Sequence, residues 1–258
     1  MRLATIVEYG RFRVAVVDAG ELRLLPAGSS IRALAAGEQP VGPTATARPM
    51  EGVRFGPVVP DPGAIYTVGL NYRDPAMPSE PGPERPMIFG KATSSVAGHG
   101  AQLRWDRSVT ATVDPECELG LVMGVGGAVF GYTIVNDISS RDPWLDGDQW
   151  LLGKSMPGFC PVGPWVVTAD EFDPTDVRLG CTINGEAIQD GRTSEMRYAI
   201  REILAYIGTH IRLEPGDLIA TGTPARLTTP PGPDRHLAPG DVVTCWIEGI
   251  GELTTTVA

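Results

Sequence analysis

The sequence of 258 residues lacks both long apolar runs and clusters of basic residues. No apolar run approaches the roughly 20 residues that a membrane-spanning helix needs. The N-terminal stretch MRLATIVEYG lacks the apolar core of a signal peptide. Lysine and arginine together number 21 against 31 aspartate and glutamate, so the formal net charge is −10. We therefore expect a cytoplasmic protein that binds neither nucleic acid nor a membrane, although an anionic small substrate would need only a local metal ion or a few cations.

Cysteine is also scarce, and its spacing excludes two common kinds of site. The four cysteines stand at positions 117, 160, 181 and 245, with no C-x-x-C pair. This pattern indicates reduced thiols in or near the core, and neither a zinc site nor a disulfide framework. Glycine (32) and proline (24) are plentiful, which is typical of many short strands joined by tight turns.

The composition changes along the chain in a way that predicts two parts. Residues 1 to about 25 alternate in polarity around two turns and predict a small β meander, followed by a short helix capped by Ser29 or Ser30. Residues 37–60 are rich in proline, glycine, alanine and threonine. We therefore place a small N-terminal β domain with its linker at residues 1–58 and a catalytic domain at residues 59–258.

Two later patterns predict local structure in the second part. Asn184-Gly185 stands between two strand-like segments and predicts a hairpin with a type I′ turn. Apolar residues recur at helical spacing after Thr193 and Ser194, and they predict a helix capped by one of these two residues and running to about Thr209.

The stretch of residues 114–124 (DPECELGLVMG) predicts a strand with two carboxylates on one face. Side chains alternate along a strand, so Glu116 and Glu118 point the same way, roughly 7 Å apart. Cys117, Leu119 and the apolar residues that follow at the same spacing take the opposite face and can form core. Two explanations are open at this point. The pair is either part of a divalent metal site, because hard cations prefer oxygen ligands, or two unrelated glutamates on a solvated face.

A third carboxylate favours the metal site. Residues 130–136 (FGYTIVN) predict a second strand, and Asp137 follows at its C-terminal end. A loop there could turn Asp137 toward Glu116 and Glu118. Three carboxylates balance the charge of a divalent ion and leave coordination positions on it for water and a chelating substrate. This arrangement is typical of Mg²⁺.

Several separated motifs, taken in order, resemble the fumarylacetoacetate hydrolase family from about residue 64 to the end. Each motif is weak alone, but the ordered set is specific. The motifs occupy residues 68–74 (VGLNYRD), 113–119 (VDPECEL), 131–137 (GYTIVND), 140–142 (SRD), 149–150 (QW), 153–155 (GKS), 159–165 (FCPVGPW), 183–185 (ING) and 220–224 (ATGTP).

The resemblance implies an α+β, mostly β fold: a mixed β roll with a small N-terminal β domain, in a homodimer. It implies Mg²⁺ or Mn²⁺ held by the three carboxylates reached above, with Lys154 and Thr223 in contact with substrate. Lys154 is the expected catalytic residue, which would add positive charge or, if the metal and burial lower its pKa, move a proton. Family substrates are 2-oxo acids and 1,3-dicarbonyl acids. The reactions are C–C hydrolysis, decarboxylation, hydration and isomerisation, each through an enolate that a metal can stabilise. From the same motifs we take Arg73, Arg141 and Gln149 as further candidate substrate-binding residues.

One departure from the family concerns the base that activates water. Hydrolases of the family carry a histidine directly after the N-Y-x-D motif and a glutamate a few residues on, both on a lid helix. Here Pro75 takes the histidine position, and the prolines that follow exclude a helix. Glu80 and Glu84 lie nearby without a histidine. Among the three histidines of the chain, His236 is the candidate substitute base, the alternative being an exposed loop residue.

Three more departures indicate a reshaped pocket. Trp144 stands where many relatives have a substrate-binding glutamine, and Arg226 replaces the usual glycine after T-P-A. Trp144 either offers its ring to an apolar substrate or packs in the core, and Arg226 either meets a second carboxylate or is solvated. The insert before the second strand, residues 125–128, is also shorter than is usual in the family.

Three functions remain, in order of preference. The first is a metal-dependent isomerase or decarboxylase that acts on a 2-oxo or 1,3-dicarbonyl acid through an enolate, since this chemistry needs no histidine base. The second is a C–C hydrolase that uses His236 or a glutamate of residues 80–84 as its base. The third is a non-catalytic homologue that binds a dicarboxylate.

Overall fold

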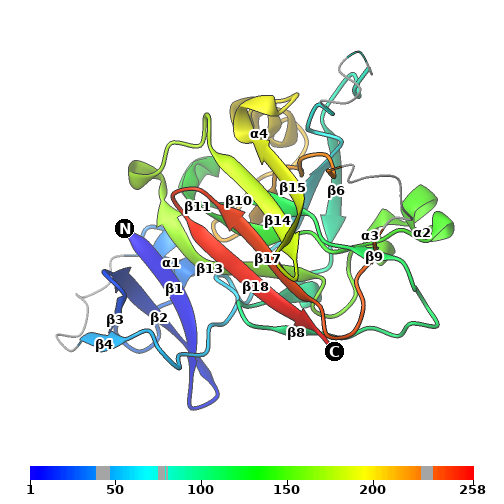
Figure 1. Ribbon diagram of the computed structural model, residues 1–258. Helices are drawn as coiled ribbons and strands as arrows, with labels where there is room; N and C mark the ends of the chain where they lie inside the picture. The colour runs from blue at the N-terminus through cyan, green and yellow to red at the C-terminus, as the bar shows by residue number, and fades with distance from the viewer. Residues whose placement is uncertain (39–46, 75–78, 80, 228–234) are drawn as a thin grey trace.

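The computed structural model describes residues 1–38, 47–74, 79, 81–227 and 235–258. In this part of the chain the strands form three sheets of 11, five and two strands, and the helices are short. The fold is therefore of the mostly β, α+β type that the sequence predicts. Figure 1 shows the five-stranded sheet lying across the central strands of the largest sheet, with the N-terminal strands at one side and helices α2 and α3 at the other.

The largest sheet has the strand order β4-β3-β2-β1-β13-β11-β10-β16-β5-β6, with β7 added beside β13. It is mixed, because β16–β5 and β13–β7 are parallel pairs and the other pairs are antiparallel. Its strands are β1 (Arg2–Glu8), β2 (Arg11–Asp18), β3 (Glu21–Leu24), β4 (Ala47–Pro49), β5 (Ile65–Gly69), β6 (Met87–Lys91), β7 (Val96–Ala97), β10 (Cys117–Met123), β11 (Val129–Asn136), β13 (Cys160–Thr168) and β16 (Leu218–Ala220).

The other elements complete the fold around this sheet. The five-stranded sheet contains β15 (Glu186–Arg192), β14 (Arg178–Ile183), β17 (Val242–Ile247), β18 (Gly251–Val257) and β8 (Gln102–Leu103), and β9 (Val113–Asp114) pairs with β12 (Ser139–Ser140). The α-helices are α1 (Ile31–Ala35), α2 (Pro143–Asp148), α3 (Trp150–Gly153) and α4 (Ile200–Gly208). Single 3₁₀ turns are η1 (Thr93–Ser95), η2 (Val125–Gly127), η3 (Ala169–Glu171) and η4 (Thr193–Glu195).

The N-terminal strands form the predicted meander and extend the largest sheet. β1, β2 and β3 pair in sequence, and α1 follows with Ser30 as its N-cap. β1 also pairs with β13 at Arg2↔Val167, so the meander continues a sheet built mainly from the second half of the chain. The division of the chain near residue 58 stays a prediction.

The two faces of β10 build two different cores, as the alternation of its side chains predicts. Cys117, Leu119 and Leu121 belong to the core that also contains the inward side chains of the five-stranded sheet. Val122 faces the other way and packs in a second core with Ile31 of α1. Because both faces of β10 are covered, the carboxylates at its start are carried by a rigid, buried strand.

Of the two local predictions in the second part of the chain, the hairpin is confirmed, and the helix is confirmed at its end but not at its start. Asn184 and Gly185 have φ of 53° and 83° and join β14 to β15, as the hairpin signal predicts. The helix predicted from Thr193 or Ser194 begins only at Ile200. The preceding backbone bonds elsewhere: the Thr193 N–H donates to the Val177 carbonyl at 2.9 Å, and the Arg197 N–H donates to the Asn71 carbonyl at 2.6 Å.

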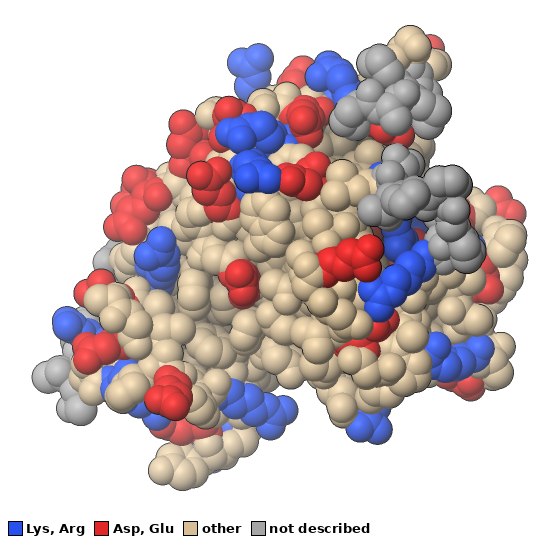
Figure 2. All heavy atoms as spheres, in the orientation of Figure 1, with Lys and Arg blue, Asp and Glu red and all other residues tan. Residues whose placement is uncertain are grey.

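The surface shows no segregation of charge on the face drawn in Figure 2. Acidic and basic side chains are interspersed there, and uncharged residues cover most of the five-stranded sheet. Among the helices of the described residues, none combines the length and the apolar character needed to cross a membrane.

Candidate active site

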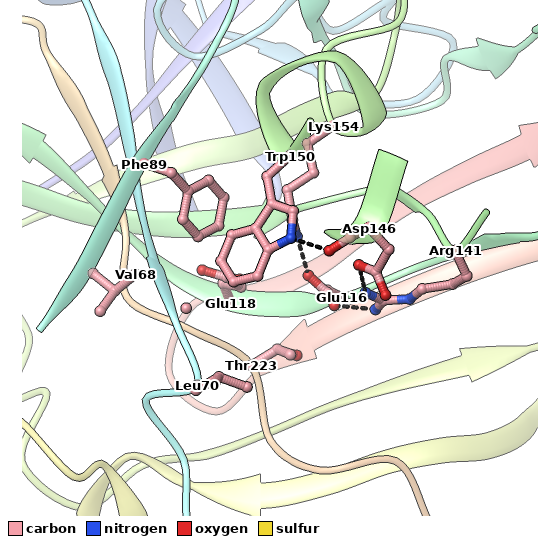
Figure 3. A pocket seen from close by; sticks show the side chains of 11 residues that line it. Val68, Leu70, Phe89, Glu116, Glu118, Arg141, Asp146, Trp150, Lys154 and Thr223 are labelled. Atoms are coloured by element: carbon pink, nitrogen blue, oxygen red, sulfur yellow. Dashed lines mark hydrogen bonds and ion pairs between the residues drawn. The ribbon is translucent and has the colours of Figure 1, made fainter. Parts of the chain in front are cut away.

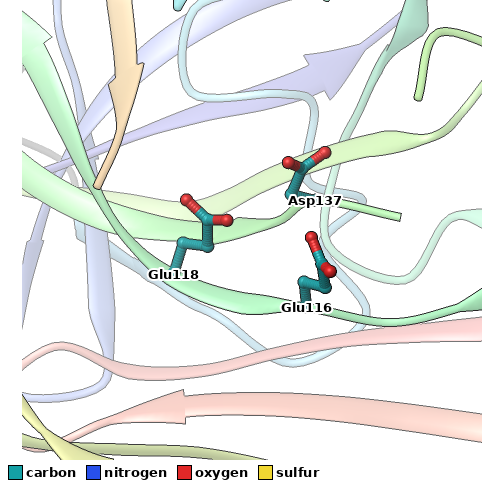
Figure 4. A group of neighbouring side chains, drawn as sticks. All are labelled: Glu116, Glu118 and Asp137. Atoms are coloured by element: carbon teal, nitrogen blue, oxygen red, sulfur yellow. The ribbon is translucent and has the colours of Figure 1, made fainter. Parts of the chain in front are cut away.

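The pairing of β10 with β11 brings the three predicted carboxylates together. The register places Cys117 opposite Asn136, and the Asp137 N–H donates to the Glu116 carbonyl at 2.8 Å. Each of Glu116, Glu118 and Asp137 offers a carboxylate oxygen, and these oxygens lie within 4.8 Å of one another. Figure 4 shows the three side chains converging from the two strand ends on one point.

Lys154 lies directly beside these carboxylates. Its ammonium group donates to Glu116 at 2.6 Å, to Asp137 at 2.9 Å and to the Ser139 hydroxyl at 2.6 Å. Lys154 is the C-terminal capping residue of α3, and its backbone N–H donates to the Trp150 carbonyl at 2.9 Å. This hydrogen bond fixes the backbone of Lys154 at the end of the helix. Lys154 is thus a predicted site residue that contacts two of the three carboxylates.

A second lysine, which the sequence reasoning missed, holds the other side of Asp137. The Lys91 ammonium group at the end of β6 bonds to the second carboxylate oxygen of Asp137 and to the Ile138 carbonyl at 3.2 Å. The side chains of Lys91 and Asp137 are both fully buried. Lys91 and Lys154 are the only lysines in the sequence, and the other 19 basic residues are arginines. That scarcity is the signal that could have identified Lys91.

The charges around the site set the protonation of its carboxylates. Burial alone would raise the pKa of Glu116, but the charges and hydrogen bonds of Lys154 and Arg141 outweigh burial and hold this pKa at about 2. Burial, followed by the charges of Asp137 and Glu116, raises the pKa of Glu118 well above its usual value. The Gly222 N–H donates to Glu118 at 2.7 Å, and among the described residues no cation pairs with this carboxylate.

This arrangement fits a hard divalent cation. Three convergent carboxylates offer oxygen ligands, and a 2+ charge would favour the ionised form of the buried Glu118. The fit therefore rests on the donor set and on a buried carboxylate that lacks its own cation.

A cavity of about 220 Å³ opens beside the acidic group. Its polar lining contains Glu116, Glu118, Lys154 and other hydrogen-bonding groups. Its apolar lining is formed by Val68, Leu70, Phe89 and Trp150, and Figure 3 shows Val68 and Phe89 on the side away from Arg141. The rings of Phe89 and Trp150 meet edge to face, with their centroids 4.9 Å apart. Such a cavity suits a small molecule with a polar head and an apolar body.

Thr223 lines the cavity and is held by a closed set of hydrogen bonds. Its hydroxyl donates to the Cys117 carbonyl at 2.8 Å and accepts from the Gln189 amide at 2.7 Å. Gln189 in turn accepts from the Cys117 N–H at 2.9 Å. Because its proton is used on β10, the Thr223 hydroxyl is left as a hydrogen-bond acceptor toward the cavity.

Arg141 is the predicted residue that links the cavity to a second charged network. It lines the cavity and bonds to Glu116, and its Nε donates to Asp114 at 3.3 Å. Asp114 also pairs with Arg226 at 3.1 Å and with His236 Nδ1 at 2.8 Å. Arg226 and His236 therefore share the Asp114 carboxylate with Arg141, which lines the cavity, but neither of them lines the cavity itself.

The remaining predicted residues lie outside the cavity lining, and their roles stay predictions. Trp144 on α2 is 56% exposed, and Gln149 and Arg73 are also exposed. Trp150, next in sequence to Gln149, lines the cavity instead. Pro75 and Glu80 fall outside the described residues, and Glu84 is exposed.

Comparisons with known proteins agree with this geometry. The chain matches the sequence model described as fumarylacetoacetate (FAA) hydrolase C-terminal over residues 64–258. It is 40% identical over 217 residues to an uncharacterised protein of Staphylococcus aureus strain USA300, a match that covers 80% of this chain and 72% of that protein.

Solved structures similar to this fold include enzymes of two named activities. A fumarylacetoacetate hydrolase from the psychrophile Exiguobacterium antarcticum superposes with a TM-score of 0.89 and 32% identity, over 100% of this chain and 99% of that chain. A 2-hydroxyhepta-2,4-diene-1,7-dioate isomerase from Mycobacterium marinum gives a TM-score of 0.80 and 31% identity, over 100% and 98%. The matched segment contains every residue of the carboxylate group and the cavity, and the chain belongs to the fumarylacetoacetate hydrolase family.

Proposed function

We propose that this protein is a divalent-metal-dependent enzyme that acts on a small anionic 2-oxo or 1,3-dicarbonyl acid through an enolate, as an isomerase or a decarboxylase. The observation that carries the proposal is the convergence of Glu116, Glu118 and Asp137 within 4.8 Å beside a cavity, with Lys154 in contact. Mg²⁺ or Mn²⁺ held by these carboxylates would supply a Lewis acid for a chelating 2-oxo acid.

Lys154 contributes positive charge at the point where an enolate oxygen would form. Burial alone would lower the pKa of Lys154, but the charges of Asp137 and Glu116 outweigh burial and raise this pKa above its usual value, so in the metal-free site this lysine is protonated. It can therefore donate a hydrogen bond to a developing oxyanion, and it is not a base in this state. The Thr223 hydroxyl, as an acceptor, can orient a protonated oxygen of the substrate.

The apolar residues of the cavity can contact the carbon chain of the substrate. Trp150 and Phe89 can cover the carbon chain and exclude water from the carbon that exchanges its proton. The isomerase named above, and a 5-carboxymethyl-2-hydroxymuconate delta-isomerase from Mycobacterium smegmatis with a TM-score of 0.79 and 30% identity, support isomerisation as the chemistry.

C–C hydrolysis is a second candidate, and one contact favours it. His236 Nδ1 lies 2.8 Å from Asp114, a pairing that orients an imidazole and leaves Nε2 to take a proton from water. The similarity to a fumarylacetoacetate hydrolase also supports this candidate. A dicarboxylate-binding protein without turnover is the third candidate. We further propose a homodimer as the assembly, which light scattering of the purified protein would test.

Proton NMR in D₂O would separate these candidates. A panel of 2-oxo acids and acylpyruvates would be followed with Mg²⁺, comparing the wild type with Asp137→Asn and with the matched control Asp190→Asn, which removes an exposed carboxylate paired with Arg178. We expect deuterium exchange at C3, or decarboxylation, in the wild type and the control. Chelation of Mg²⁺ or Asp137→Asn should abolish it. Hydrolytic fragments would favour the second candidate, and binding without turnover the third.

A further inference from the structure

Leu70 is an exposed apolar residue in the lining of the cavity, and its backbone conformation is unusual. The residue is 64% exposed although it lines the cavity. Its φ is 53°, in the left-handed region that leucine rarely adopts. Residues in such conformations cluster at ligand-binding sites, because the strain persists only where the surrounding structure imposes it.

The fold imposes this conformation from both sides of Leu70. Gly69, the last residue of β5, pairs with β6. Asn71 is fixed by its side chain, which donates to the Thr221 carbonyl at 2.7 Å and accepts from the Tyr198 N–H at 3.0 Å. The Leu70 side chain is therefore held in the cavity lining with much of its apolar surface in solvent, where a bound apolar group would cover it.

Three more apolar residues line the same cavity. The rings of Phe89 and Trp150 meet edge to face, and Val68 lies on β5 two residues before Leu70. The Trp150 ring packs on the backbone of β5, because a Cβ added at Gly69 would lie only 3.1 Å from it. Together with Leu70 these residues form the apolar wall of the cavity.

The cationic side chains of the cavity are already occupied by carboxylates. Among the described residues, Arg141 and Lys154 are the cationic residues that line the cavity. Lys154 contacts two of the metal-site carboxylates. Arg141 contacts three carboxylates, those of Asp114, Glu116 and Asp146. The stretches of sequence outside the described residues contain no lysine, arginine or histidine. A second carboxylate on the substrate would therefore find no cation in the cavity that lacks a partner.

Asp146 adds a negative charge to the cavity lining. Its carboxylate lies 3.4 Å from Arg141, beside the guanidinium group in Figure 3, and its side chain is 44% exposed. A substrate carboxylate directed toward Asp146 would meet a like charge. One directed toward the apolar wall would lose water without gaining a hydrogen-bond partner. Both directions disfavour a substrate with a charged far end.

We propose that the protein selects 2-oxo acids whose far end is uncharged and apolar, with Leu70 in contact with that end and Asp146 disfavouring a second carboxylate. The similar isomerase from Mycobacterium marinum is named for a dioate, so this selectivity would separate the two proteins. The inference rests on the proposed function, because it takes the 2-oxo acid end to lie at the metal-site carboxylates.

Titration calorimetry with Mg²⁺ and three acids tests the proposal. 2-Oxohexanoate and 2-oxoadipate have the same chain length, but only 2-oxoadipate carries a second carboxylate, and oxalate probes the metal end alone. We expect the wild type to bind 2-oxohexanoate roughly 10 to 100 times more tightly than 2-oxoadipate, because the apolar wall offers the second carboxylate no partner.

Two variants separate the apolar contact from the negative charge. Leu70→Ala should weaken the binding of 2-oxohexanoate roughly 10-fold and leave oxalate unchanged. Leu152→Ala, which truncates an exposed leucine outside the cavity lining, should change neither. Asp146→Asn should strengthen the binding of 2-oxoadipate roughly threefold or more and leave 2-oxohexanoate nearly unchanged. Asp148→Asn removes the same charge from another exposed position of α2 and should keep the wild-type ratio.

The three acids also separate the possible failures. Damage to the fold would weaken all three and would be visible by circular dichroism. If Leu70→Ala does not fold, Leu70→Gly truncates the side chain with a residue that suits a φ of 53°. A wild-type ratio near or below one, or a ratio that neither the Leu70 nor the Asp146 variant changes, would overturn the selectivity, while Mg²⁺-dependent binding of oxalate would keep the proposed function in place. If neither oxalate nor 2-oxohexanoate binds with Mg²⁺, the proposed function itself is contradicted, and the selectivity with it.

Discussion

Replacing Lys91 by methionine tests the charge balance at the centre of the site. Lys91 and Asp137 are both fully buried, so the variant leaves a buried carboxylate with one cation fewer. Removing one partner of a buried pair typically costs about 3–5 kcal/mol. Lys154 remains 2.9 Å from Asp137 and keeps part of the compensation. We therefore expect a loss near the lower end of that range, about 3 kcal/mol, in metal-free protein.

Mg²⁺ should reduce the loss in the free energy of unfolding that Lys91→Met causes. That response would locate the ion at Asp137. A divalent ion at Asp137 would supply the positive charge that Lys91 no longer provides, so we expect the loss with saturating Mg²⁺ to fall to about half of its metal-free value. Urea denaturation followed by circular dichroism, with EDTA and with Mg²⁺, measures both quantities. With a slope of about 3 kcal/mol per molar urea, the metal-free midpoint should fall by about 1 M.

Arg178→Met is the matched control, because its pair with Asp190 is half exposed and should change the midpoint far less. A loss below about 1 kcal/mol for Lys91→Met in EDTA would refute the electrostatic role of this lysine. An equal loss with and without Mg²⁺ would refute the location of the ion at Asp137.

Three further predictions concern the same cavity. Burial, and then the charges of Asp137 and Glu116, raise the pKa of Glu118. The protonated Glu118 carboxyl therefore stabilises the metal-free fold at low pH, and this stabilisation is lost as the pH rises through the raised pKa. The increase in melting temperature caused by Mg²⁺ should therefore grow as the pH rises above the usual carboxyl pKa of 4.5; an increment that stays constant would contradict this, and Glu118→Gln should remove the trend. Lys154→Met should lower the rate of metal-dependent proton exchange at C3 by roughly 10²-fold or more, measured by NMR in D₂O, and a rate near that of the wild type would exclude its role. Trp150→Ala removes one half of the ring pair with Phe89, so the affinity for 2-oxohexanoate should fall roughly 10-fold further than the affinity for oxalate, measured by calorimetry; equal losses would show that the apolar wall does not contact the substrate.

Local patterns in the sequence were sufficient for several elements. The alternation along residues 114–124 placed Glu116 and Glu118 on one face and Cys117 and Leu119 in the core. The turn chemistry of Asn184-Gly185 required a left-handed backbone, and both residues have positive φ. These predictions succeed because each depends on residues adjacent in the chain.

The late start of α4 shows where local pattern is not enough. Apolar spacing from Met196 onward favours a helix, but the segment before Ile200 uses its backbone N–H groups on Asn71 and Val177. The Tyr198 N–H, for example, donates to the Asn71 side chain at 3.0 Å. Tertiary hydrogen bonds therefore override local propensity here.

The sequence by itself determined the strands, the three carboxylates and the family, because periodicity and ordered motifs are properties of short segments. Only the tertiary structure decided that Lys91 from β6 faces Asp137, that Trp150 lines the cavity while Trp144 is exposed, and that three distant basic groups meet at Asp114. These contacts join residues dozens of positions apart. The packing of whole strands and helices sets such contacts, and no local pattern encodes which strand lies beside which.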